Sequence, residues 1–211
     1  MFNIGYVIPI LMSCHALFVE LVKYKKEEVS KNIIQFIHAL IFIFCHNYES
    51  DMVYITHISI GFYTYDLIYL FVSILKDKSK ASQHASYIVH HLITVRILYY
   101  SLYSIYSVSI LNAFYILEMS NIMLYISYHI HKEYKNHKLI YYTDFIQLIW
   151  YSYYRIIKLL LFSFKIKNEI LDNHISIPIM VFIIYLMSAS WCYKLVKINI
   201  KNFNSYKTLK N

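Results

Sequence analysis

About seven apolar runs of near-spanning length follow one another along the chain, and they constrain its fold more than any other feature. An α-helix rises about 1.5 Å per residue, so roughly 20 apolar residues cross the hydrocarbon core of a bilayer. Only two Gly and two Pro occur, which is too little turn chemistry for a β-rich architecture. The sequence therefore predicts an all-α, multi-pass transmembrane helical bundle. Its expected helices are Tyr6–Val22, Ile33–His46, Val53–Leu75, His84–Ser101, Ile105–Tyr128, Ile140–Phe164 and Ile175–Leu195.

Positive charge is distributed unevenly among the connections between these runs. Lysines cluster after the first, third, fifth and seventh runs, for example in Lys23–Lys31 and Lys76–Lys80, whereas the alternate connections are poor or balanced in positive charge. Connections rich in lysine are retained in the cytosol. We therefore expect an odd number of spans, a lumenal N-terminus and a cytosolic C-terminus. Because no basic segment precedes the first run, we expect no cleaved signal peptide.

The remaining composition excludes several classes of function. The net charge of +8 arises from lysines between the runs, so it indicates topology and not a nucleic-acid surface. The three cysteines form neither a disulfide framework nor a metal-binding spacing. The eleven histidines lack the spacings of membrane di-iron sites. We expect no metal and no cofactor, and we expect His129, His131 and His137 to lie in a solvated cytosolic loop.

Ionisable and polar side chains inside four consecutive runs are the main candidates for a functional site. Each ionisable group costs roughly 2.5–3.5 kcal/mol on insertion into a membrane, so such residues usually mark a site. Counted from the cytosolic ends of the helices, they lie at a similar depth of roughly 9–15 Å. They are His38, Asp66, His90, His91, Glu118 and Asn121. We expect them to form a polar layer in a cavity open to the cytosolic leaflet, with purely interhelical packing as the alternative.

Helical spacing indicates which other side chains share the faces of this layer. Thr94 lies one turn beyond the histidine pair, so it can approach the same side of its helix. Two further stripes at helical spacing should point inward. The first consists of Ser59, Tyr63, Asp66 and Ser73, and the second of Phe114, Glu118, Asn121 and Tyr125.

Two arginines lie deeper, near the middle of the fourth and sixth predicted helices. We expect Arg96 and Arg155 each to face a carboxylate, a carbonyl oxygen or a lipid headgroup, because an unpaired charge is costly in a membrane. Asp66 and Glu118 are the candidate carboxylates. A structural ion pair and a contact with substrate both remain open for these arginines.

Short motifs around these residues occur in a fixed order along the chain. They are Ile37-His38-Ala39-Leu40, Ser59–Leu67, His90-His91-Leu-Ile-Thr94, Leu117-Glu118-Met119-Ser120-Asn121 and Tyr154-Arg155. This ordered set resembles the TLC family, the TRAM, Lag1 and CLN8 homology group of endoplasmic-reticulum membrane proteins. The resemblance implies six helices around a central cavity, preceded by one further helix. It divides the chain into a first helix and loop (1–30), a TLC domain (31–198) and a cytosolic tail (199–211).

Two branches of this family bear on function. Ceramide synthases carry His-His-x-x-Thr followed by His-Asp-x-x-Asp, and they join an acyl-CoA to a sphingoid base. The first motif matches at His90, His91 and Thr94, but Leu117-Glu118-Met-Ser-Asn121 stands in place of the second. That version is more similar to the TLC-domain-containing proteins of the TMEM56 type, which are linked to membrane lipid composition. The resemblance therefore implies a role in lipid metabolism or lipid homeostasis, including that of sphingolipids.

These considerations predict a membrane protein that binds or modifies a lipid or a fatty acyl-CoA. If the protein is an enzyme, the chemistry would be acyl transfer, with His90 or His91 as general base and Glu118 and Asp66 completing the catalytic set. The expected substrate-binding residues are His38, Thr94, Arg96, Asn121, Tyr125 and Arg155. The alternatives are a ceramide-synthase-like N-acyltransferase, a non-enzymatic lipid sensor or trafficking partner, and a transporter of lipid or small solute. The oligomeric state stays open.

Overall fold

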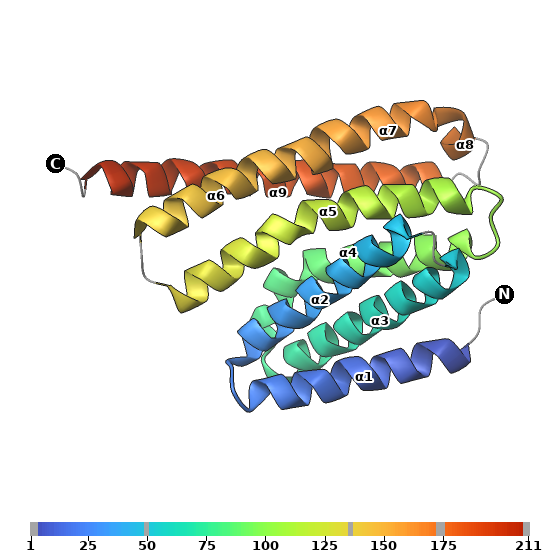
Figure 1. Ribbon diagram of the computed structural model, residues 1–211, viewed down its shortest axis with the longest axis horizontal. Helices are drawn as coiled ribbons and strands as arrows, with labels where there is room; N and C mark the ends of the chain where they lie inside the picture. Colours follow the sequence, from blue (N-terminus) through green and yellow to red (C-terminus); the bar gives the residue numbers. More distant parts are fainter. Residues whose placement is uncertain (1–3, 49–50, 135–136, 172–175, 209–211) are drawn as a thin grey trace. The chain divides into compact units, whose positions relative to one another are not determined.

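The computed structural model describes residues 4–48, 51–134, 137–171 and 176–208, and every regular element in these ranges is helical (Figure 1). This confirms the predicted all-α, multi-pass helical bundle. Its elements are α1 (Ile4–Val22), α2 (Glu27–Asn47), α3 (Met52–Lys76), the short turn η1 (Lys78–Lys80), α4 (Ala81–Ser101), α5 (Ser107–Glu133), α6 (His137–Tyr151), the π-helical segment η2 (Ser152–Lys158), α7 (Leu159–Lys165), α8 (Lys167–Leu171) and α9 (Ser176–Thr208).

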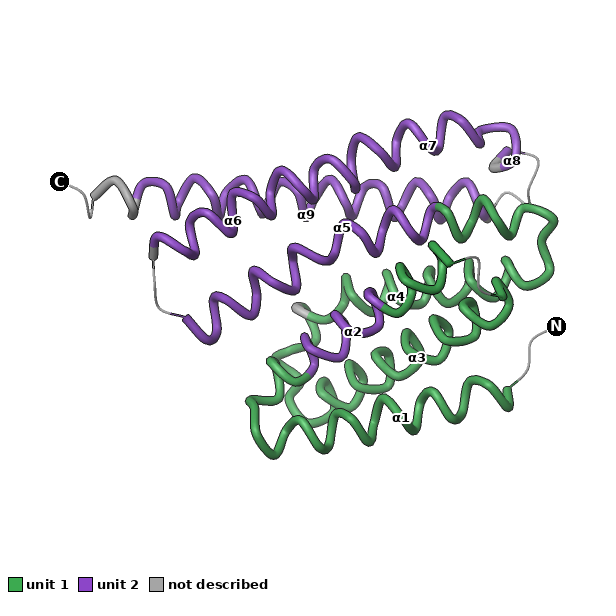
Figure 2. The backbone as a smooth tube through the Cα atoms, in the orientation of Figure 1, with its two compact units in different colours: residues 1–30, 41–112 green, residues 31–40, 113–211 purple. Residues whose placement is uncertain are grey.

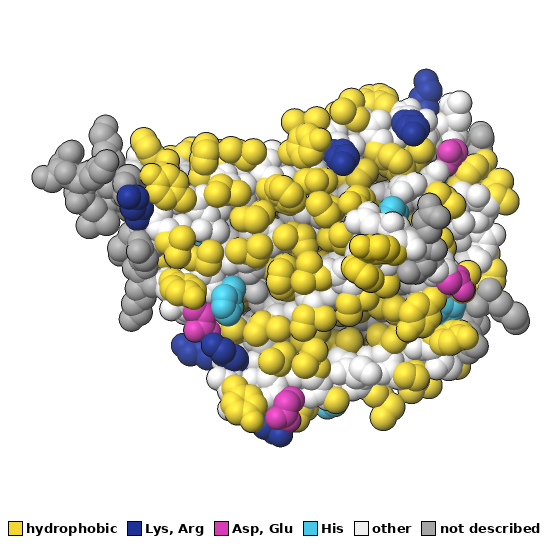
Figure 3. All heavy atoms as spheres, viewed as in Figure 1, with side chains coloured by type: hydrophobic (Ala, Val, Ile, Leu, Met, Phe, Trp, Pro, Cys, Tyr) yellow, Lys and Arg dark blue, Asp and Glu magenta, His cyan; other side chains and the backbone are white. Residues whose placement is uncertain are grey.

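Five of the described helices are long and apolar enough to cross a membrane, namely α1, α2, α3, α5 and most of α9. Two further predicted spans exist as helices but do not meet that criterion. α4 carries His90, His91 and Arg96, and the run predicted over Ile140–Phe164 is divided by η2. Large apolar side chains such as Met12 and Phe182 are exposed, and Figure 3 shows such side chains over most of the face in view. A bilayer is the environment that such a surface requires.

The chain forms two compact units, drawn in different colours in Figure 2. Unit 1 contains residues 1–30 and 41–112, and its central element is α3, which packs against both α1 and α4. The close approach of α1 depends on Gly61, since a Cβ atom built there would lie 2.8 Å from Ile10 Cγ2 and 3.4 Å from the Val7 carbonyl oxygen. A residue without a side chain at this position lets the two helices pack closely.

Unit 2 contains residues 31–40 and 113–211. In this unit α6 packs along α9, η2 continues the contact with α9, and the short helix α8 contacts both α7 and α9. At about 1.5 Å per residue the 33 residues of α9 extend roughly 50 Å, which exceeds the ~30 Å of a hydrocarbon core. The sequence predicts a cytosolic tail over residues 199–211. The structure shows that α9 continues through this segment as far as Thr208.

The structure differs from the sequence prediction in three places. α5 continues to Glu133, so placing His129 and His131 in a loop was wrong, and His137 is the first residue of α6. The helix extends because no Gly or Pro interrupts it. The π-helical segment was not foreseen, and Ile175 lies outside the described residues. The division at residues 30/31 and 198/199 and the central cavity stay predictions.

Candidate functional site

Two buried polar side chains of unit 1 meet between α3 and α4. His91 Nε2 lies 2.6 Å from Asp66 Oδ2, and the two side chains are 8% and 3% exposed. An ionised carboxylate only accepts hydrogen bonds, so Nε2 is the donor in this contact and Nδ1 is the ring nitrogen that remains. Nδ1 is buried and has no hydrogen-bond partner among the described residues. The pair therefore presents an oriented imidazole with one nitrogen left for another group.

Thr94, which lies on α4 with His91, has a second buried polar atom that can form a further hydrogen bond. A buried threonine usually donates to the carbonyl one turn earlier, as Thr56 and Thr64 do here to Met52 and Ile60. Thr94 is 1% exposed, and its Oγ1 has no such partner in the described part of the chain. Each unsatisfied buried polar group costs about 1–3 kcal/mol. A ligand that supplied a hydrogen-bonding group here would remove that cost.

Aromatic rings enclose the imidazole of His91. The Tyr63 ring lies 5.2 Å from it and the His90 ring 5.4 Å, measured between centroids. All four residues of the stripe predicted on α3, which includes Tyr63 and Asp66, are buried. The inward direction of this stripe is thus confirmed.

Unit 2 brings together a second set of predicted residues. His38 Nδ1 lies 3.9 Å from Glu118 Oε1, and Asn121 Nδ2 lies 3.4 Å from Glu118 Oε2, to which it donates. Glu118 is 1% exposed. The Tyr125 ring packs edge-on against Phe36 at 6.2 Å. His38, Glu118 and Asn121 thus form one cluster, whereas Asp66 contacts His91. A single polar layer shared by all four helices stays a prediction.

The two arginines occupy opposite environments. Arg96 is exposed on the surface of α4. Arg155, in η2, is 1% exposed, and its Nη1 lies 3.5 Å from the carbonyl oxygen of Leu117. Within the described residues no carboxylate lies at ion-pair distance from Arg155. Of the partners expected for it from sequence, the carbonyl oxygen is the one that the structure provides.

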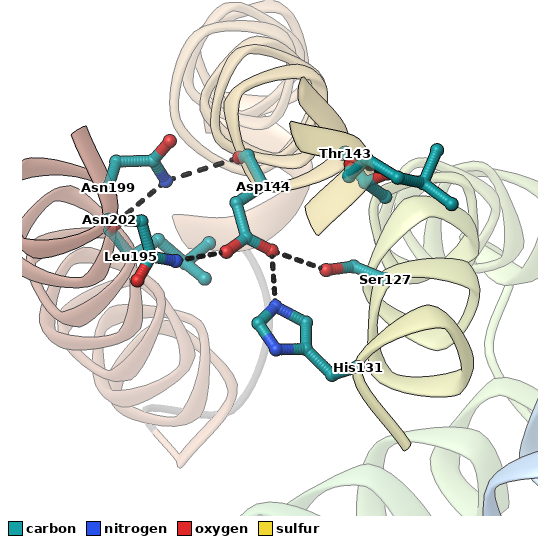
Figure 4. Close-up of polar contacts among 8 residues, drawn as sticks. Ser127, His131, Thr143, Asp144, Leu195, Asn199 and Asn202 are labelled. Carbon is teal, nitrogen blue, oxygen red and sulfur yellow. Dashed lines mark hydrogen bonds and ion pairs between the residues drawn. The ribbon is translucent and has the colours of Figure 1, made fainter. Parts of the chain in front are cut away.

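The sequence prediction missed a buried carboxylate of unit 2, Asp144 of α6 (Figure 4). Its Oδ1 accepts hydrogen bonds from Ser127 Oγ and His131 Nε2, both at 2.7 Å, and its Oδ2 accepts one from Asn202 Nδ2 at 2.5 Å. The carboxylate therefore joins α5, α6 and α9. The signal in the sequence was an ionisable residue inside the predicted Ile140–Phe164 helix.

A further bond strengthens the same junction. Asn199 Nδ2 donates to the backbone carbonyl of Asp144 at 3.1 Å and to that of Leu195 at 3.0 Å. Since the Asp144 side chain is 2% exposed and accepts three hydrogen bonds, its charge is well compensated. This arrangement is typical of a structural junction and leaves the carboxylate little capacity for a ligand.

The described residues contain no group of three or more His, Cys, Asp or Glu side chains that could hold a metal ion. A protein-family model described as the TLC domain matches residues 44–197. No curated protein and no solved structure matches the chain significantly. The matched segment begins in α2, ends in α9 and includes the His91–Asp66 pair, Glu118 and Arg155.

Proposed function

The chain belongs to the TLC domain family, and from this premise we propose that it binds and chemically modifies a membrane lipid, with the His91–Asp66 pair as its acid–base centre. The observation that carries this proposal is the buried imidazole whose Nε2 is held by Asp66 while Nδ1 has no partner in the described part of the chain. An oriented imidazole of this kind is suited to proton transfer.

The reaction we propose is acyl transfer from a fatty acyl-CoA to a lipid amine or hydroxyl. The nucleophile attacks the thioester carbonyl and its proton passes to His91 Nδ1. The carbon–sulfur bond then breaks, and the coenzyme A thiolate leaves with the proton that His91 returns to it. Asp66 would stabilise the imidazolium formed on His91. Thr94 would bind a second polar atom of the substrate, and His90 would line the same site.

The second cluster, which belongs to unit 2, is proposed to bind a polar group of a membrane lipid. Glu118, with His38 and Asn121, would bind an amine or hydroxyl of a lipid, and Tyr125 of the same unit would contact that lipid. Arg96, exposed on α4 of unit 1, would contact a lipid headgroup. The Glu118-Met119-Ser120 motif supports placing the chain with the TMEM56-type branch of the family. On the same grounds we propose the endoplasmic reticulum as its membrane, with a lumenal N-terminus and a cytosolic C-terminus. A non-enzymatic lipid-binding role would use the same residues. Among the described residues, no contact favours a transporter.

The test measures acyl-CoA-dependent N-acylation of a sphingoid base in membranes from cells that lack their own ceramide synthases. Wild type is compared with His91→Ala and Asp66→Asn, together with the lipids that co-purify with each protein. His84→Ala is the matched control, because His84 lies on the same helix and its Nε2 contacts Ser73 Oγ at 3.3 Å.

Product that is lost in His91→Ala and Asp66→Asn but kept in His84→Ala supports the acyltransferase. Absence of product with wild type, combined with a co-purifying lipid that His91→Ala loses, rejects the chemical step and supports the binding role. Folded His91→Ala and Asp66→Asn proteins with wild-type product and wild-type bound lipids would overturn the proposal altogether.

A further inference from the structure

Arg155 is the largest of the fully buried side chains in the described residues, yet its hydrogen-bonding groups are poorly used. Its Nε is buried without a hydrogen-bond partner. Its bond to the Leu117 carbonyl, at 3.5 Å, is at the outer limit for a hydrogen bond. Ser120 Oγ already donates to that carbonyl oxygen over a much shorter distance. The guanidinium therefore retains most of its capacity to donate.

The charge of Arg155 is also left largely uncompensated. A guanidinium is ionised in any protein environment, and burying it is strongly unfavourable unless an anion compensates its charge. The Tyr151 and Trp191 rings lie 5.8 and 5.9 Å from its central carbon. Cation–π contacts of this kind offset only part of the cost of burying the charge. No carboxylate of the described residues lies at ion-pair distance from Arg155. An anion from outside the chain would therefore compensate the positive charge of its guanidinium.

The backbone around Arg155 is held in an uncommon conformation. η2 is a seven-residue π-helical segment, and Arg155 lies at its middle. π-helical turns are rare and occur frequently at functional sites. Trp150 Nε1 donates to the Met119 carbonyl at 2.6 Å, and Ser152 Oγ lies 3.3 Å from Cys192 Sγ. These contacts attach the last turn of α6 to α5 and the start of η2 to α9, so the guanidinium is positioned before any ligand arrives.

We propose that Arg155 is a receptor for an oxyanion, either the carboxylate or phosphate of a lipid headgroup or a free phosphate. The planar guanidinium can donate two parallel hydrogen bonds to such a group, and the flanking Tyr151 and Trp191 rings keep water away from the pair. The site belongs to unit 2 and uses none of the residues of the His91–Asp66 pair. It therefore stands independently of the proposed acyl transfer.

The experiment titrates the purified full chain in neutral detergent with three acidic probes and one neutral probe. The acidic probes are inorganic phosphate, oleate and phosphatidate, and the neutral probe is diacylglycerol. Binding is measured by native mass spectrometry and by the rise in thermal unfolding temperature that a ligand produces. The variants are Arg155→Met, which removes the charge, and Arg155→Lys, which keeps a charge but loses the planar fork. Lys158→Met is the control, because it removes a partly exposed charge from the same segment.

We expect wild type and Lys158→Met to bind an acidic probe equally, within about twofold, while Arg155→Lys binds at least about tenfold more weakly and Arg155→Met not at all. Binding of phosphate identifies a free-anion site, and binding of oleate or phosphatidate alone identifies a lipid headgroup. The proposal is overturned if folded wild type binds no acidic probe, or if either Arg155 variant binds as wild type does. Should Arg155→Met fail to fold, Arg155→Lys decides the question alone.

Discussion

His91 of α4 and Asp66 of α3 are 25 positions apart in the sequence, yet His91 Nε2 lies 2.6 Å from Asp66 Oδ2.

This contact predicts the effect of Asp66→Asn. An asparagine oxygen can still accept the hydrogen bond from Nε2, but the negative charge that would stabilise an imidazolium on His91 is lost. We expect the rate of acyl transfer to fall by about 100-fold or more while the protein stays folded. The rate is measured in membranes, and thermal unfolding of the purified variant is the control. A wild-type rate in Asp66→Asn would show that Asp66 has no part in proton transfer.

Replacing Gly61 by alanine tests the packing of α1 on α3. Alanine favours a helix over glycine by about 1 kcal/mol, whereas overpacking a tight contact costs about 1–3 kcal/mol. Because the new Cβ would meet the branched Cβ of Ile10 at 2.9 Å, we expect a net loss of about 1–2 kcal/mol. Thermal unfolding in detergent measures it. Gly5→Ala, at an exposed position of α1, is the control and should not destabilise the protein.

Asp144→Ala should destabilise unit 2. The substitution leaves Ser127, His131 and Asn202 without their acceptor, at about 1–3 kcal/mol for each buried donor. Since His131 is partly exposed, we expect a total loss of roughly 3 kcal/mol or more in unfolding free energy. Thr143→Val is the control, because Thr143 Oγ1 bonds only the Leu139 carbonyl of its own helix, and it should change stability by under about 1 kcal/mol. Equal unfolding temperatures for the two variants would contradict the claim that the Asp144 carboxylate stabilises the packing of α5, α6 and α9.

Asp77, in the connection between α3 and α4, predicts a local dependence on pH. Hydrogen bonds from the Ser79 hydroxyl at 2.7 Å and the Ser79 backbone at 3.0 Å lower the pKa of its carboxyl below the usual 3.8. A lowered pKa in the folded state means that the stabilisation is fully present above pH 3.8 and is lost as the pH falls through the folded value. Amide exchange at Ser79 should be faster in Asp77→Ala than in wild type at neutral pH. This difference should shrink at about pH 2, and a difference that persists there would contradict the role of the carboxylate.

Much of the fold follows from the sequence because helix formation and membrane insertion depend on local properties. The length of each apolar run and the scarcity of Gly and Pro indicate where the long helices lie, although α2 begins at Glu27, before the predicted Ile33, and α9 continues past the predicted Leu195 to Thr208. Helical spacing also places Tyr63 and Asp66 on one buried face, because residues three or four apart share a side of a helix.

The partners of the polar side chains were decided by the tertiary structure. Spacing within α4 identifies His91 and Thr94 as neighbours, but only the packing of α3 against α4 pairs His91 with Asp66. The same holds for Asp144, whose donors lie 17 and 58 positions away at Ser127 and Asn202. The sequence by itself therefore determined the helices and their apolar surface, since these depend on neighbouring residues. The hydrogen bonds of the buried groups depend on which helices pack together, so the tertiary structure alone assigned them.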